Sequence, residues 1–437
     1  MKKVPVVRVV APDAADAVVQ GLPVSTQIAL AQVAETMREG LLAFTTAAGL
    51  AVFRALLDEE LTAKIGPKHA KQPEGRVGNW HGTTTGQVTL GGRKISVERP
   101  RGRLVGGGEI ASDTWDVFAA DDLLQQVIVE RMLAGVATRR HMAVAEPVGG
   151  QLKARSTSKS AVSRRFITAT ETAMAELLAR DLSELDVAVL MIDGVHFADE
   201  VLVVAMVITT DGTKIPVGLA HGDTENAAVV KGMLADLVAR GLNPDAGMLV
   251  VLDGSKALRK AVNSVFGANV AVQRCTLHKR RNVSEYLPVE RRAVIDRRLA
   301  QVFADPDPAT GLRKAKVLAK ELELAYPDAA ASLREGLDEM FTVTAIGAGP
   351  TLRRTLSTTN PIESMISIAR TTTGHVKNWK TGAMRKRWAA AAMLEAERSF
   401  RRIKGHKELP AFTTRLRARI HTANGTVTPP EYAHTAA

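Results

Sequence analysis

The middle of the chain carries short continuous runs of apolar residues, each ended by a turn signal. Val187 to Ile192 and Val201 to Thr209 are two such runs. Asp211-Gly212 marks a turn, and Lys214 to Ala220 can form a third strand after it. Successive strands joined by short turns predict an antiparallel meander.

Periodic and continuous apolar patterns then alternate. Val229, Met233 and Leu237 recur at helical spacing, and Met248 to Leu252 is a short buried strand. A further helix and a fifth strand at Val270 to Gln273 follow. The order of three strands, helix, strand, helix, strand predicts an α/β fold class with an RNase H-like catalytic domain.

The regions on either side of this domain are mostly helical. We expect the RNase H-like domain to carry an α-helical insertion and to be preceded by mostly helical DNA-binding regions. Residues 25–61, 121–134, 138–145 and 160–179 are expected helices. The expected domains are a helical region at 1–68, a basic hairpin or linker at 69–118, a possible helix-turn-helix at 119–185, the core at 186–281, the insertion at 282–355, core completion with a basic helix at 356–408, and a disordered tail at 409–437, above all beyond Gly425.

Charge and composition restrict the function. The formal net charge is +12 and the pI is about 9.8, which indicates a polyanionic partner such as nucleic acid. A single cysteine excludes a disulfide framework and a Cys-rich zinc module within the chain. No apolar run is long enough for a membrane helix and no signal-peptide pattern opens the chain, so we expect a cytoplasmic protein without a membrane partner.

Basic residues gather in two segments of the N-terminal half. One segment lies along the expected hairpin on either side of Gly91-Gly92. Its basic side chains can contact phosphates or simply be solvated, and the sequence fits both interpretations equally. The other surrounds the start of the third expected helix, in the position of a recognition helix. The DNA-contacting candidates there are Lys153, Arg155, Arg164 and Arg165.

Three carboxylates carry the candidate chemistry. Asp193 and Asp253 each follow an apolar strand and precede a glycine, so each carboxylate is expected to be exposed at the edge of the sheet where the backbone turns away. If the two strands are neighbours in the sheet, the two carboxylates converge. Glu363 follows Asn360-Pro361, a helix-start signal, and is expected in the first helical turn. Each residue also has a structural interpretation: an Asp-Gly turn, a helix cap at Asp253, or a capping box at Glu363.

The chain resembles the Mutator-type transposases of bacterial insertion sequences. The resemblance rests on Met191 to Val195, Val250 to Ser255, Arg274 to Lys279 and Ser357 to Ser364, and it covers most of the chain. The last two motifs, Cys-x-x-His and Asn-Pro-Ile-Glu in this order, are the specific ones.

The resemblance implies a DDE transposase that cleaves DNA and transfers the strand without a covalent protein intermediate. Asp193, Asp253 and Glu363 become catalytic residues and ligands of two Mg²⁺ or Mn²⁺ ions, which suits the oxygen preference of these ions. Cys275 and His278 become a signature pair near the site. The implied partners are double-stranded DNA, as terminal inverted repeats and target, and a second copy of the chain, since two DNA ends must be paired.

Cys275 and His278 alone supply two ligands, whereas structural zinc takes four. We therefore expect no zinc site; the pair is expected to pack and hydrogen-bond after the fifth strand, with His278 near enough to touch a substrate phosphate.

The region after Arg353 is the most basic, and Glu363 lies inside it. Trp379 and Trp388, nine residues apart in a helical region, are more typical of core residues than of base-stacking residues. The preferred DNA contacts are Lys377, Lys380, Arg385, Lys386 and Arg387.

Two other functions remain open. A non-catalytic DNA-binding regulator would use the same basic helices but would have no need of the acidic triad. A nuclease on the same fold would cut DNA without joining it. A covalent recombinase is disfavoured, because Tyr286, Tyr326 and Tyr432 stand outside any cluster of Arg and His.

Overall fold

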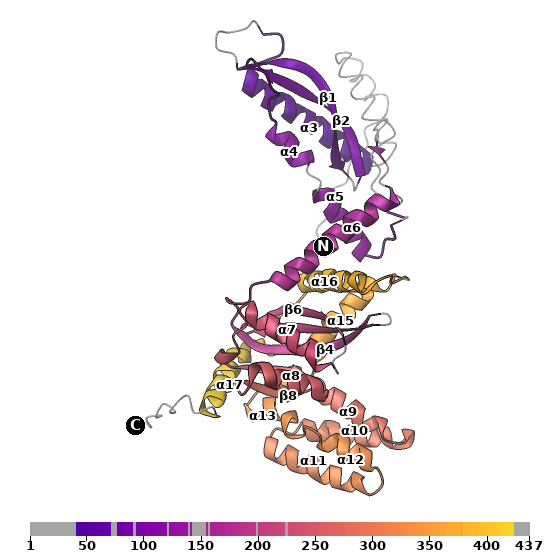
Figure 1. Ribbon diagram of the computed structural model, residues 1–437, viewed down its shortest axis with the longest axis vertical. Helices are drawn as coiled ribbons and strands as arrows, with labels where there is room; N and C mark the ends of the chain where they lie inside the picture. Colours follow the sequence, from indigo (N-terminus) through magenta and orange to yellow (C-terminus); the bar gives the residue numbers. More distant parts are fainter. Residues whose placement is uncertain are drawn as a thin grey trace, which may run out of the picture. The chain divides into compact units, whose positions relative to one another are not determined.

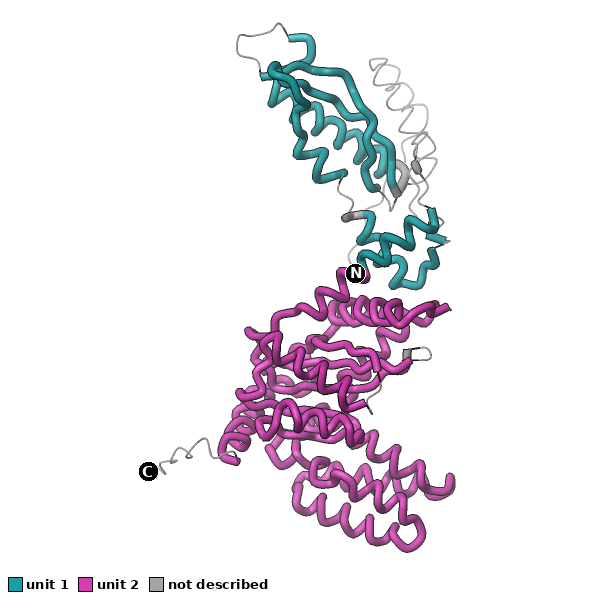
Figure 2. The backbone as a smooth tube through the Cα atoms, in the orientation of Figure 1, with its two compact units in different colours: residues 1–169 teal, residues 170–437 magenta. Residues whose placement is uncertain are grey.

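The computed structural model describes residues 41–70, 77–90, 93–119, 122–138, 140–141, 154–155, 158–197, 200–222, 226–376 and 378–423. The chain divides into two compact units, Met1–Ala169 and Thr170–Ala437 (Figure 2). No helix within the described ranges combines the length and apolar character needed to cross a bilayer.

The first unit is built around a long antiparallel hairpin. Strand β1 (Gly78–Leu90) pairs with β2 (Arg93–Leu104), and β2 also pairs with the short β3 (Ala154–Arg155). The predicted hairpin is therefore confirmed, with strands longer than expected. The remaining elements are α3 (Leu41–Ile65), α4 (Asp113–Ala119), α5 (Asp122–Leu133), β3 (Ala154–Arg155) and the start of α6 (Lys159–Ala179).

Helix α3 packs its apolar side on this hairpin. Phe53 and Leu57 of α3 share a core with Ile95 of β2 and Trp115 of α4. The Trp115 ring lies so close to β1 that a Cβ at Gly86 would come within 2.1 Å of it. Glycine is thus required at Gly86 for α4 to pack on the strand.

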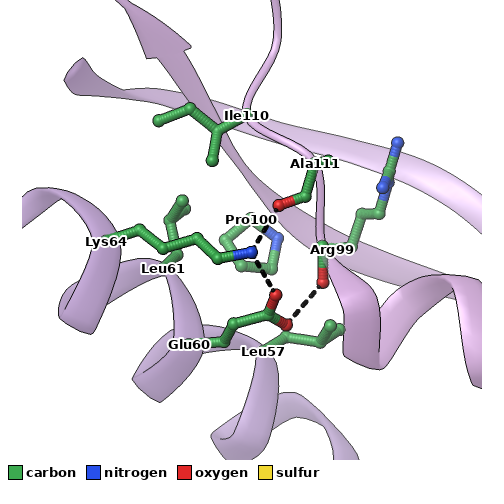
Figure 3. A pocket seen from close by; sticks show the side chains of 9 residues that line it. Leu57, Glu60, Leu61, Lys64, Arg99, Pro100, Ile110 and Ala111 are labelled. Atoms are coloured by element: carbon green, nitrogen blue, oxygen red, sulfur yellow. Dashed lines mark hydrogen bonds and ion pairs between the residues drawn. The ribbon is translucent and has the colours of Figure 1, made fainter. Parts of the chain in front are cut away.

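An ion-paired cluster ties α3 to the chain that leads into α4 (Figure 3). Lys64 donates to Glu60 at 2.7 Å and to the Ala111 carbonyl at 2.9 Å. Burial opposes the charge of Glu60, but the hydrogen bonds from Lys64 and Ser112 outweigh it and hold the pKa of Glu60 at about 2. The polar groups of this cluster hydrogen-bond one another, so its role is to hold α3 against the chain before α4.

Some predicted helices extend beyond what is described. The expected helix at 25–61 is observed from Leu41, and its earlier part lies outside the described residues. Most of the expected helix at 138–145 also lies outside them. The helices at 121–134 and 160–179 are confirmed as α5 and α6.

The second unit contains a five-stranded mixed sheet in the order β6-β5-β4-β7-β8 (Figure 1). Strands β4 to β6 form the predicted antiparallel meander, and β7 and β8 run parallel to β4. The strands are β4 (Val187–Phe197), β5 (Glu200–Thr209), β6 (Lys214–His221), β7 (Met248–Leu252) and β8 (Val270–Arg274).

Helices cover both faces of this sheet. Leu190 and Ile192 of β4 belong to the core under α7 (Ala227–Ala239) and α8 (Lys256–Phe266). Val189 and Met191, one residue out of phase, face the opposite core. That second core is completed by α15 (Asn360–Thr373), α16 (Gly382–Arg398) and α17 (Leu409–Ala423). This alternation determines which face of the sheet the side chain of each following residue of β4 and β7 lies on.

The segment predicted as a helical insertion is helical and has a core of its own, which includes Leu299 and Leu333. Buried Lys279, on the helix that leads into this segment, donates to the carbonyls of Ser332 at 2.6 Å and Glu335 at 2.8 Å near the end of α12 (Pro327–Arg334). The helices here are α9 (Thr276–Glu285), α10 (Val289–Phe303), α11 (Pro308–Glu323), α12 (Pro327–Arg334), α13 (Thr342–Ala345) and α14 (Pro350–Leu356), and the short 3₁₀ turns of the unit are Pro244–Ala246, Asp338–Met340 and His406–Glu408.

The disordered tail expected at 409–437 differs from the structure in its first part. Leu409–Ala423 forms α17, and Phe412, Leu416 and Ile420 are buried against the sheet. These apolar residues recur at helical spacing, a signal that the proline and threonine residues around them obscured. The remaining residues, from 424 on, lie outside the described part of the chain.

Because Phe412 is fully buried in this core, Phe412→Ala should lower the free energy of unfolding by about 3 to 5 kcal/mol, through lost burial and a residual cavity. Chemical denaturation followed by circular dichroism measures the change. Arg419→Ala, an exposed change on the same helix, is the control and should have little effect. Equal stability of the two variants would mean that α17 does not belong to the core.

Candidate active site

The register between β4 and β7 brings two acidic residues together. Ile192 of β4 is the parallel partner of Leu252 of β7, and each is followed by an aspartate. Asp193 and Asp253 therefore follow register partners on adjacent strands, close enough for the charge of Asp253 to act on Asp193. Asp193 follows the phase of Met191 and Val195, which face the core under α15. Both carboxylates lie at this edge of the parallel strand pair.

The position of Asp193 within its strand differs from the prediction. We expected the strand to end there in a turn, but β4 continues through Gly194 to Phe197, paired with β5. The pairing with β7 is what stops, at Ile192. An Asp-Gly turn is thus the wrong interpretation at Asp193. The expected exposure of this carboxylate is wrong as well, because Asp193 is only 6% exposed and its Oδ1 accepts from the Gly194 N–H at 2.9 Å.

Asp253 begins the loop after β7 and lines a cleft shared with Lys256, His278 and Asn282. Its Oδ1 accepts from the Ser255 N–H at 2.8 Å, and the Ser255 hydroxyl caps α8 by accepting from Leu258. The suggestion that Asp253 caps this helix is therefore wrong, and its carboxylate faces the cleft.

Glu363 lies in the first turn of α15, as predicted from Asn360-Pro361. The helix is preceded by Thr359, whose hydroxyl donates to Glu363 Oε1 at 2.9 Å. The capping-box interpretation, in which Glu363 would bond back to Asn360, is not the one observed. The Thr359 hydroxyl instead fixes the direction of the Glu363 carboxylate.

Thr359 also joins Glu363 to the Cys-x-x-His element. Its hydroxyl is 3.4 Å from His278 Nδ1 and 3.3 Å from the Cys275 sulfur. His278 Nε2 is 3.9 Å from Glu363 Oε1. Cys275 stands next to the sheet because its N–H donates to the Leu252 carbonyl at 2.8 Å. Cys275 is a buried packing and hydrogen-bonding residue, as expected.

The charges of this group are strongly coupled. Burial, together with the nearby Asp253 and Glu363, raises the pKa of Asp193 to about 7, with His278 opposing the rise. Contact with Cys275, and the carboxylates of Asp193 and Asp253, raise the pKa of His278 to about 9 against its own burial. Burial favours the neutral Cys275 thiol, but His278 and Thr359 outweigh it and lower the pKa of that thiol. The site thus combines a cationic imidazole with carboxylates that repel one another.

The donor set suits a hard divalent cation. Asp193, Asp253 and Glu363 offer carboxylate oxygens, which Mg²⁺ prefers as ligands. A Mg²⁺ ion often binds only one or two carboxylates of a protein and takes its other ligands from water and substrate. Like charges held together out of water are stabilised by a cation between them. Within the described ranges, however, no three His, Cys, Asp or Glu side chains are grouped closely enough to hold one ion. Binding of one ion by all three carboxylates would therefore require at least one of these side chains to move.

The helical segment after β8 fixes the loop that carries Asp253. Arg274, 6% exposed at the end of β8, donates to the Gly254 carbonyl at 3.2 Å. The same guanidinium pairs with Glu339 at 2.7 Å and Glu335 at 3.3 Å. Residues more than 60 positions away thereby stabilise the backbone next to Asp253.

The structure describes only some of the candidate DNA-contacting residues of the first unit. Arg164 is exposed on α6 and Arg165 is half-buried. Lys153 and the side chain of Arg155 lie outside the described residues.

The candidates near α16 are not equivalent. Lys380 is exposed and Lys386 is half-buried, while Lys377 lies outside the described residues. Arg385 is buried and its guanidinium pairs with Glu200 at 2.7 Å. Its charge is already compensated, so it is poorly placed to contact a phosphate.

Arg387 is likewise directed inward, with its guanidinium donating to the Thr170 hydroxyl at 2.8 Å. Trp388 is buried, and Trp379 packs edge-on against it with ring centroids 6.3 Å apart. The interpretation as a core residue is confirmed for Trp388, while Trp379 is half-buried and packs against the core.

Comparison with known proteins identifies the family. The sequence model described as "Transposase, Mutator family" matches residues 24–397, which is most of the chain. The chain belongs to the Mutator family of transposases.

Individual relatives match this chain at about 30% identity and over only part of its length. The chain is similar to the transposase for insertion sequence element IS6120 of Mycolicibacterium smegmatis, at 31% identity over 202 residues, 44% of this chain and 60% of the relative. It is also similar to a probable insertion-sequence transposase of Corynebacterium diphtheriae, at 30% identity over 219 residues, 49% of this chain and 62% of the relative. The aligned regions thus span about three fifths of these relatives.

Asp193→Asn should stabilise the protein in metal-free buffer containing EDTA. The asparagine keeps an oxygen for the Gly194 N–H but removes a buried charge that Asp253 and Glu363 repel. We expect a gain of about 1 to 3 kcal/mol in the free energy of unfolding, measured by urea denaturation. Asp328→Asn, at an exposed position on α12, should change little. A variant less stable than the wild type would show that the Asp193 charge is well compensated within the protein.

Proposed function

We propose that this chain is a DDE transposase that cleaves DNA and joins the freed end to target DNA, with Asp193, Asp253 and Glu363 as its catalytic residues. The observation that carries the proposal is the parallel register that sets Asp193 beside Asp253, on the face of the sheet covered by the helix of Glu363. Carboxylates so arranged form a centre for phosphoryl transfer.

The strand order supports the RNase H-like part of the proposal. Three antiparallel strands are followed by helix, strand, helix, strand, and the last two strands extend the sheet beside β4. That is the order expected from the sequence for this fold. The helical segment between Asp253 and Glu363, with its separate core, fits the role of an insertion.

The three carboxylates would hold two divalent ions, Mg²⁺ or Mn²⁺. When bound, such ions activate the attacking oxygen and neutralise charge on the leaving one. Thr359 orients Glu363, and Arg274 fixes the backbone beside Asp253. His278, cationic near neutral pH and partly exposed in the cleft, can donate a hydrogen bond to a non-bridging phosphate oxygen.

Two displacements at phosphorus make up the proposed reaction. A water oxygen first attacks the phosphorus at the end of the element, the bond to the 3′ oxygen breaks, and that oxygen takes up a proton. The resulting 3′-hydroxyl then loses its proton and attacks a phosphorus of target DNA, whose own 3′ oxygen leaves as a hydroxyl. The second step exchanges one phosphodiester bond for another, so it needs no external energy source.

The proposed substrates are the double-stranded terminal inverted repeats of an insertion sequence and its target DNA. Two ends must be held at once, so at least two copies of the chain are expected on DNA. The proteins from Mycolicibacterium smegmatis and Corynebacterium diphtheriae are both named as insertion-sequence transposases, which supports this substrate class.

A regulator without catalytic activity would not need a buried carboxylate beside two others, an arrangement that costs stability. A nuclease on the same fold would use the same site. The second alternative is distinguished by product, because only a transposase covalently joins the element's end to target DNA.

Asp193→Asn, Asp253→Asn and Glu363→Gln should each reduce Mg²⁺-dependent cleavage of the element's own ends by at least about a hundredfold, because several kcal/mol of charge stabilisation are lost. Gel electrophoresis of labelled DNA measures cleavage and strand transfer together. Binding of the same DNA should persist.

The matched control is Glu395→Gln, on α16, whose exposed carboxylate pairs with Arg398. It should leave cleavage at the wild-type rate. Wild-type activity in any of the three site variants would refute the assignment of that residue, while cleavage without joined product would favour the nuclease.

Thr359→Val should raise the Mg²⁺ concentration needed for half-maximal cleavage and slow cleavage about tenfold at limiting Mg²⁺, which corresponds to about 1.4 kcal/mol. The valine keeps the shape of a fully buried side chain but cannot donate to Glu363. Thr359→Ser restores the hydroxyl and should restore the Mg²⁺ response. If the serine variant is as impaired as the valine variant, the threonine matters for packing and not for orienting Glu363.

A further inference from the structure

A basic surface on α8 leads away from the catalytic cleft. Lys256, at the start of the helix, lines the cleft of Asp253 and also a second, neighbouring depression. Lys260 and Asn263 line that second depression further along the same helix. The two hollows thus share Lys256 as a lining residue, and together they are called the polar track of α8.

The construction of α8 separates this track from the core. Leu258, Val262 and Phe266 are buried on one side of the helix. Lys256 and Lys260, one turn apart, are exposed on the other. Two lysines on an amphipathic helix are by themselves no more than a solvated face, so the pattern of residues alone does not mark them as DNA contacts.

Charge compensation distinguishes these two lysines from the arginines beside them. Arg259 pairs with Glu339 at 2.6 Å, and Arg274 pairs with Glu335 and Glu339. In the described part of the chain, no carboxylate pairs with Lys256 or Lys260. Glu335 and Glu339 are therefore paired with arginines, and the other carboxylate of the lining, Asp253, belongs to the candidate active site. The charges of the two lysines remain for a ligand.

The lining of the track indicates which ligand it suits. Ammonium, amide and guanidinium groups line it, together with the His278 imidazole and the carboxylates of Asp253 and Glu335. The His278 ring is held against Thr359, and the lining includes no Phe, Tyr or Trp ring on which an unpaired base could stack. Lysines a helical turn apart beside a phosphoryl-transfer centre match the sugar-phosphate backbone of a duplex, which is bound by charge and without regard to sequence.

We propose that the exposed side of α8, through Lys256 and Lys260, binds the phosphate backbone of the duplex that enters the catalytic cleft. This inference rests on the proposed function, since it takes Asp253 as part of the reacting centre. Lys256 contacts a phosphate next to the scissile one, and Lys260 contacts one further along the same strand.

The test is the salt dependence of binding to a fluorescent DNA duplex of arbitrary sequence, followed by anisotropy with the full chain. Each phosphate contact contributes roughly 0.9 to the slope of log K against log salt, so Lys256→Gln with Lys260→Gln should reduce that slope by about 1.8. The single Lys260→Gln variant should reduce it by about 0.9, and it provides the same test if the double variant does not fold.

The matched control is Lys316→Gln with Lys320→Gln, which removes the same charge from exposed positions on α11. Its slope should equal that of the wild type. Lys256→Arg with Lys260→Arg retains the charge and should also retain the slope.

The outcomes separate this inference from the proposed function. If the wild type binds with a steep salt dependence and the α8 and α11 variants change the slope equally, the track is wrong and only overall charge matters. If the wild type shows no salt-dependent binding to duplex DNA, the proposed function itself fails.

Discussion

The structure depends on the parallel pairing of β4 with β7, which places two aspartates side by side at one edge of the sheet. Ile192 and Leu252 are register partners, so a slip of one residue in this pairing would turn one aspartate to the opposite face. The register is in turn held by apolar layers on both faces, which bury every side chain from Val187 to Ile192. Ordinary core packing therefore fixes the geometry of the charged site.

The same site opposes folding locally. Asp193 is buried beside two other carboxylates, and His278 compensates only part of that charge. Around it the protein supplies directional contacts: Thr359 holds Glu363, and Arg274 holds the loop of Asp253. The large apolar core around the site contributes enough stability for the protein to stay folded despite the unfavourable free energy of these buried charges.

Much of this arrangement could be predicted from the sequence. The strands from 187 to 274 follow from apolar runs ended by turn residues, and Glu363 was placed in a first helical turn by Asn360-Pro361. The continuation of β4 past Asp193 could not be predicted, because Asp-Gly usually marks a turn and only pairing with β5 keeps the strand extended. Helix α17 was missed, and the burial of Arg385 depends on its partner Glu200, which lies 185 positions away. Contacts of that kind leave no local signal.

The distance along the chain between the acidic residues has a consequence for synthesis. Asp193 and Asp253 emerge from the ribosome well before Glu363, and the helix α17 that completes their core comes later still. A nascent or prematurely ended polypeptide lacking residues after 360 therefore carries the first unit and the basic α8 without the third acidic residue. Such fragments also lack α15, α16 and α17, so one face of the sheet has no complete core until the C-terminal helices have been made.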